Sequence, residues 1–96
     1  MDFEFIVRCS KPGCQESARY KIASPWHHGC FSELKTYGFA CANHVRDILY
    51  DAEVRWLEYE PVSEESLGEL GVYRFQPGLR DHELERDHEL ESILRS

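Results

Sequence analysis

Between residues 45 and 59, apolar and polar positions repeat with the period of an α-helix. Apolar side chains recur at i, i+3, i+4 and i+7, and most of the opposite positions are charged. Asn43 is a candidate N-cap, and Pro61 prevents further helix. We therefore expect one amphipathic helix between these two residues, with its apolar face formed by Val45, Ile48, Leu49, Ala52, Trp56 and Tyr59.

Three shorter segments alternate between apolar and polar residues, as half-buried β-strands do. They are residues 3–8, 18–22 and 32–40. Residues 24–29 contain Pro25 and Gly29 and are typical of a loop. The sequence thus predicts a β-hairpin whose arms are 18–22 and 32–40.

The pattern weakens after Pro61. Residues 62–71 are polar with two glycines and predict a loop or one short helical turn. Residues 72–75 are a candidate strand, and Tyr73 and Phe75 are expected to complete the core. We expect three parts: a hairpin and helix module over 1–60, a packing loop and strand over 61–80, and an acidic C-terminal helix over 81–96.

The final segment repeats a hexapeptide, at 81–86 and again at 87–92, with helix-forming composition. Six residues advance a helix by about 600°, so the repeat rotates around the helix axis. Leu90, Ile93 and Leu94 nevertheless gather on one side. This narrow apolar patch predicts a helix that docks on its own domain or pairs with another copy; the alternative is a fraying, solvated tail.

Two clusters carry the candidate chemistry, a C-x4-C motif at Cys9 and Cys14 and a C-x2-H motif at Cys41 and His44. Three thiols and one imidazole in two close pairs are typical of a closed, tetrahedral structural zinc site. Four protein ligands leave no open position for water or substrate, whereas a catalytic zinc ion usually keeps one. The sequence therefore predicts one structural Zn²⁺ held by these four residues.

Cys30, His27 and His28 are the other residues that could bind a metal or take part in catalysis. Cys30 is interpreted as a buried apolar residue in preference to an alternative ligand or a redox thiol. His27 and His28 are interpreted as exposed loop residues in preference to a second metal site or a catalytic pair with Cys30. His82 and His88 read as surface residues.

Size and charge narrow the classes of function. The chain has 96 residues and a net charge of −7; residues 1–59 hold 8 acidic and 7 basic side chains, and residues 60–96 hold 10 and 4. A bound metal can supply stability that the hydrophobic core of such a small domain lacks. The sequence has no cluster of Lys and Arg to bind a phosphate backbone, so nucleic acid is not the expected partner. An acidic start and no long apolar run favour a cytoplasmic, reduced protein without a membrane segment.

A knuckle, a hairpin and a helix that carries the second ligand pair form the arrangement of a treble-clef zinc finger. The chain resembles small bacterial zinc-binding modules, including those of the activator of bacterial protein-arginine kinase, across residues 9–50. The resemblance rests on four segments, Cys9-x4-Cys14, 18–22, 33–35 and Cys41-x2-His44. It departs from the kinase activator in His44, a longer knuckle, a longer hairpin loop and a single module. Such modules usually bind other proteins, which is what the resemblance implies here.

We therefore expect a small α+β, treble-clef-like zinc domain with a C-terminal helical extension. The leading hypothesis is a non-enzymatic interaction or adaptor module that meets a protein partner, or a second copy, through residues 26–31 or the acidic tail. A nucleic-acid-binding zinc finger is the alternative, which Arg19, Lys21 and Lys35 on one exposed face would favour. A Cys/His enzyme that uses Cys30 is a third.

Overall fold

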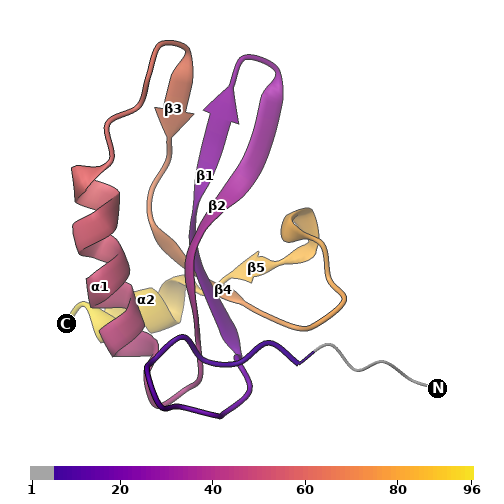
Figure 1. The fold of residues 1–96 in the computed structure, drawn as a ribbon, viewed down its shortest axis with the longest axis vertical. Coiled ribbons are helices and arrows are strands. Elements are labelled where there is room, and N and C mark those ends of the chain that lie inside the picture. The colour runs from indigo at the N-terminus through magenta and orange to yellow at the C-terminus, as the bar shows by residue number, and fades with distance from the viewer. Residues whose placement is uncertain (1–5) are drawn as a thin grey trace.

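A computed structural model describes residues 6–96 of the chain. Its elements in chain order are β1 (Tyr20–His28), β2 (Phe31–Ala40), α1 (Val45–Glu58), β3 (Glu65–Leu67), β4 (Gly71–Arg74), the 3-10 helix η1 (Asp81–Glu83), β5 (Glu85–Arg86) and α2 (His88–Leu94) (Figure 1). The predicted α+β class is confirmed. The strand predicted over 3–8 lies partly outside the described residues, and within them only Arg8 forms a β-bridge, with Ser17.

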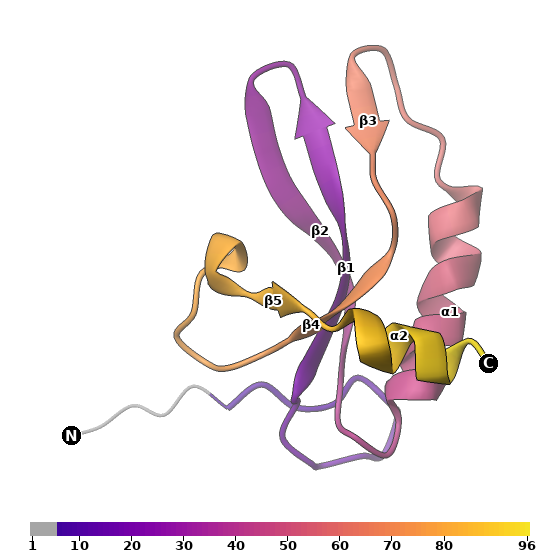
Figure 2. The same ribbon diagram turned by 180° about the vertical axis from the view of Figure 1, so that it is seen from behind.

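All five strands form one antiparallel sheet with β1 near its centre. The sheet order is β2-β1-β4-β5, and β3 also pairs with β1. β4 pairs with residues 20–23 of β1, and β3 pairs with residues 26–28. The long strand β1 therefore has β2 along one side and two short strands in succession along the other, as Figures 1 and 2 show.

The hydrophobic core lies between this sheet and the two helices. The predicted apolar face of α1 is confirmed at Val45, Ile48, Leu49 and Ala52, which are buried, and Trp56 packs against them. Val72 is the β4 residue that enters the core cluster. Tyr73 is buried, as predicted, but lies outside this cluster, and Phe75 is only half-buried. The reason is strand alternation: Tyr73 lies opposite Arg86 of β5, and Phe75 packs edge-on against Phe39.

The hairpin is longer than predicted because residues 24–28 continue β1. Its turn is Gly29-Cys30, and Gly29 has a φ of 58°, as a type II′ turn with glycine at its first central position requires. Pro25 has no N–H to donate to a neighbouring strand. Its carbonyl accepts from Gly68 N at 2.7 Å, on the side of β1 where β3 lies. The prediction of a loop at 24–29 was therefore wrong.

Two further local predictions need correction. His44, and not Asn43, occupies the N-cap position of α1, and it makes no side-chain cap hydrogen bond. Residues 65–67, predicted as part of a loop or one short helical turn, form β3. The indole N–H of Trp56 donates to the carbonyl of Gly68 at 3.0 Å, so α1 and the end of β3 are tied together.

The two copies of the hexapeptide adopt different structures. The first copy forms η1 and β5, and only the second lies in α2, so the helix predicted over 81–96 is shorter. Asp81 of the first copy pairs with Lys21 of β1 at 2.7 Å, whereas Asp87 of the second caps α2 by accepting from Leu90 N at 3.0 Å. Tertiary contacts thus decide between two outcomes of one local sequence.

α2 docks on the sheet instead of extending into solvent. Leu94 is buried in the core cluster and Leu90 packs against it, while Ile93 is 61% exposed. In Figure 2, α2 crosses in front of the lower part of α1. In the part of the chain that the structure describes, no helix is both long and apolar enough to cross a membrane.

Candidate metal centre

The first ligand pair lies in a tight knuckle that starts at the Arg8–Ser17 bridge. Cys9 N donates to Glu16 O at 2.9 Å, and Cys14 N donates to Lys11 O at 3.0 Å. Gly13 has a φ of 84°, which lets the chain reverse between the two cysteines. The knuckle thereby turns both thiols toward one point.

The knuckle is fastened to β2 beside its ligands. Ser10 N donates to Phe39 O at 2.8 Å, and Ser10 Oγ accepts from Phe39 N at 2.9 Å. A Cβ on Gly38 would meet Ile48 Cγ2 at 3.0 Å, so this glycine allows the close approach of β2 and α1. Ser10 and Gly38 were not singled out from the sequence, although a glycine inside a strand pattern is a signal of close backbone approach.

The second ligand pair lies between the end of β2 and the start of α1. Cys41 follows Ala40 directly, and His44 N donates to Cys41 O at 3.2 Å in a turn that leads into the helix. Lys11 of the knuckle pairs with Asp47 of α1 at 3.2 Å. The hairpin and α1 therefore deliver the second pair to the knuckle, as the spacing of the motifs predicts.

Cys9, Cys14, Cys41 and His44 meet in one cluster. Their candidate ligand atoms all lie within 4.8 Å of one another. The Sγ atoms of Cys14 and Cys41 are 3.9 Å apart, and His44 Nδ1 lies 3.4 Å from Cys41 Sγ and 3.7 Å from Cys9 Sγ. A metal ion can be held at this point by three sulfurs and one nitrogen.

The electrostatics of the cluster favour a cation at its centre. Burial raises the pKa of Cys9, but backbone hydrogen bonds, that of Cys41 first, and the His44 side chain outweigh it and lower that pKa to about 7. For Cys14, a backbone hydrogen bond with Glu16 favours the thiolate, yet burial and the neighbouring thiols raise its pKa. The Cys9 thiol therefore ionises readily, whereas a second negative charge on Cys14 is unfavourable beside it. A bound metal cation would offset the repulsion between the two thiolates.

The remaining candidates do not join this cluster. Within residues 6–96 no other set of three or more Cys, His and carboxylate side chains lies close enough to hold a metal. Cys30 is exposed in the hairpin turn, so its prediction as a buried apolar residue was wrong. His27 is exposed on β1, and His28 stacks on Trp26 with ring centroids 6.0 Å apart.

The three basic side chains on which the nucleic-acid alternative depends are dispersed. Lys21 is buried and pairs with Asp81, far along the chain from the ligands. Lys35 lies over the ring of Tyr59, with its Nζ 4.2 Å from the centroid. Arg19 is exposed. The three therefore form no common basic face.

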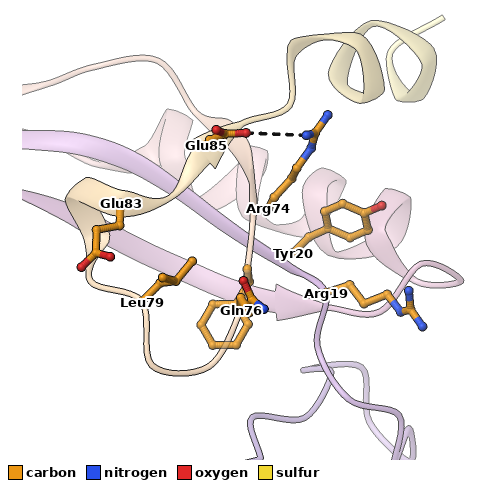
Figure 3. Close-up of a pocket in the computed structure, with 8 residues that line it drawn as sticks. Arg19, Tyr20, Arg74, Gln76, Leu79, Glu83 and Glu85 are labelled. Carbon is orange, nitrogen blue, oxygen red and sulfur yellow. Dashed lines mark ion pairs between the residues drawn. The ribbon is translucent and has the colours of Figure 1, made fainter.

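A hollow of about 600 Å³ lies on another part of the sheet, and its lining gives no convergent chemistry (Figure 3). Arg74 is paired with both Glu85 and Asp87, which neutralise its charge. Figure 3 shows Arg19 directed away from Glu83 and Glu85. The hollow mixes both signs of charge with apolar surface, so we assign no ligand to it.

Comparisons with family models, with curated proteins and with solved structures found no match to this chain. The resemblance to bacterial zinc modules therefore stays a prediction.

Proposed function

We propose that the chain is a non-enzymatic protein-interaction module whose fold is stabilised by one structural Zn²⁺ bound to Cys9, Cys14, Cys41 and His44. The separations in the cluster support zinc. A tetrahedral zinc ion with ordinary Zn–S and Zn–N bond lengths places sulfurs about 3.8 Å apart and sulfur and nitrogen about 3.5 Å apart. The Sγ atoms of Cys14 and Cys41 are 3.9 Å apart, and His44 Nδ1 lies 3.4 and 3.7 Å from two of the sulfurs; all the ligand atoms lie within 4.8 Å of one another.

The order of elements supports a treble-clef arrangement. A knuckle with the first pair is followed by the hairpin of β1 and β2, and the second pair directly precedes α1. In this arrangement the partial positive charge at the start of α1 favours the Cys41 thiolate. Zn²⁺ would join the knuckle, the hairpin and the helix at their common point.

The single observation that carries the functional proposal is that the cluster supplies four ligands. A zinc ion with four protein ligands has no free position at which to activate water or bind substrate, so its role is to hold the fold. Function then belongs to the surface. Cys30 and His27 are exposed at the hairpin end, and among the described residues no hydrogen bond joins Cys30 to His27 or His28, which gives the enzyme alternative little support.

One side of α1 has the character of a partner surface. Tyr50, Val54 and Leu57 form a line at i, i+4 and i+7 that we term the α1 stripe, and they are 48, 56 and 70% exposed. Tyr50 OH donates to Leu94 O at 3.3 Å, which brings the exposed Ile93 of α2 beside the stripe.

Carboxylates flank the α1 stripe and define the kind of partner. Glu53 and Glu58 are on the same helix and form no ion pair among the residues described. We propose a protein segment with apolar side chains flanked by Lys or Arg. Nucleic acid is less well supported, because Arg19, Lys21 and Lys35 lie apart and the whole chain carries −7.

The double variant V54S/L57S tests this proposal. Immobilised wild-type and variant proteins, both loaded with zinc and matched by circular dichroism, are incubated with lysate of the organism that encodes the chain. We expect a basic protein that the wild type retains and V54S/L57S loses, and direct titration with that purified protein should show weaker binding to the variant. The control V62S removes an exposed apolar residue outside the stripe and should bind like the wild type. Identical sets of retained proteins for all three would contradict the proposal.

A further inference from the structure

The outer edge of β2 is the one long sheet edge in the described part of the chain. The other unpaired edges belong to β3 and β5, which have three and two residues, whereas β2 has ten. Figures 1 and 2 show no other element along the outer side of β2 near the hairpin turn. Natural proteins usually shorten, cover or charge such an edge, because its free N–H and C=O groups can pair with another strand.

The half of β2 nearer the knuckle is already covered. Ser10 occupies the outward N–H and C=O of Phe39, and the guanidinium of Arg55 donates to the carbonyl of Tyr37 at 2.6 Å. The open part is therefore residues 32–36, between Tyr37 and the turn.

The hairpin register determines which backbone groups of this open part face outward. In a two-residue hairpin the pair next to the turn, His28 and Phe31, exchanges hydrogen bonds, and the pairs then alternate. Ser32, Leu34 and Thr36 consequently direct their N–H and C=O away from β1. No hydrogen bond to these outward groups is found within residues 6–96. The edge offers three donors and three acceptors to a strand.

The charged side chains along this edge are complementary to those of the same edge in a second copy. When two copies of β2 pair antiparallel about a two-fold axis at Leu34, Glu33 of each copy lies opposite Lys35 of the other. Shifting the axis to Glu33 or to Lys35 places like charges opposite each other, which is unfavourable. The two-fold at Leu34 also pairs Ser32 with Thr36, so that outward backbone groups meet outward backbone groups.

We infer that this edge is a self-association site, at which residues 32–36 pair with the same residues of a second copy and join two sheets into one. The partner is a second copy of the chain. The surface that binds it is separate from the α1 stripe, so the inference goes beyond the function proposed above. The contact is isologous, so it closes at a dimer. Phe31, 68% exposed beside the turn, extends the contact on the face that carries Glu33.

Charge reversal tests the inference, with sedimentation equilibrium of the zinc-loaded full chain as the readout. We expect the wild type to dimerise with increasing concentration. E33K and K35E should each weaken the dimer roughly tenfold, because two cross-strand pairs change from attraction to repulsion. The swap E33K/K35E should restore it, and so should mixing the two single variants, because each then meets its complement. E60K makes the same charge change at an exposed position beyond the end of α1 and should leave the dimer unchanged.

Several results would overturn the inference. They are a wild type that stays monomeric at every concentration, a dimer that is indifferent to E33K and K35E, and single variants that neither the swap nor the mixture rescues. Loss of the dimer in V54S/L57S would also overturn it, since the α1 stripe would then form the contact. None of these results depends on whether the α1 stripe binds another protein.

Discussion

Glu91 is the residue on which the C-terminal part of the fold depends. The residue is buried, 4% exposed. Its carboxylate accepts from Arg86 Nε and Nη2 at 2.8 Å each, from Val72 N at 3.1 Å and from Arg95 at 3.2 Å. A buried carboxylate is tolerated only when such partners replace water. Burial raises its pKa, but Arg86 and the amide of Val72 outweigh burial and hold the pKa below its ordinary value.

The variant E91Q should lower the free energy of unfolding by about 2 to 3 kcal/mol, because the Arg86 guanidinium loses its buried counterion. Urea denaturation of the zinc-loaded protein measures this loss. E89Q is the matched control: Glu89 is exposed on the same helix, and its change should stay within about 0.5 kcal/mol. Equal effects of the two substitutions would show that the Glu91 contacts do not stabilise the fold.

The difference in unfolding free energy between the wild type and E91Q should depend on pH. The pKa of Glu91 is lowered in the folded state, so its contribution is complete above the unfolded pKa of about 4.3 and is lost as the pH falls through the folded value. The difference in unfolding free energy between wild type and E91Q should therefore be constant near neutral pH and shrink below about pH 4. Both proteins keep the same metal ligands, so the difference isolates Glu91. A difference that grows on acidification would contradict the sign of the shift.

At the scale of elements, regular periodicity was a better guide than local composition. The helix α1 follows directly from its 3.6-residue pattern, and its predicted buried face is correct over four of six positions, from Val45 to Ala52. The prediction of a loop at 24–29 was wrong because the central strand β1 continues through Pro25, whose carbonyl is hydrogen-bonded on the side where β3 lies. That accommodation depends on a partner more than 40 positions away in the chain, which local reasoning does not include.

The hexapeptide repeat shows the same limit more sharply, since Asp81 of its first copy pairs with Lys21, which lies 60 positions away in the chain. The docking of α2, by contrast, was one of two predicted outcomes for its apolar patch.

Substitutions on α2 test that docking. L94A should lower the free energy of unfolding by about 2 to 4 kcal/mol, because it empties a core position that is 6% exposed. I93A, one residue away and 61% exposed, should change it by less than about 0.5 kcal/mol. Both are measured by urea denaturation of the zinc-loaded chain. If L94A is as harmless as I93A, α2 is a frayed tail in solution.

At the scale of the whole molecule, the metal cluster joins segments that otherwise make limited contact. The knuckle is held to β2 by Ser10 and to α1 by the exposed pair of Lys11 and Asp47. The four-ligand grouping could be predicted from motif spacing, because paired ligands separated by a hairpin have few other ways to meet. The partner surfaces could not, since the α1 stripe and the β2 edge depend on which sides the tertiary fold leaves uncovered.

The most direct test of the central claim is the metal content of the chain purified without added metal, followed by unfolding in excess chelator. We predict one zinc per chain by elemental analysis and loss of the folded circular dichroism spectrum on chelation, because zinc binding and folding are coupled in a domain of this size. The variant C30S should give the same result, since Cys30 lies outside the cluster. A protein that contains no metal and keeps its fold in chelator would contradict the account.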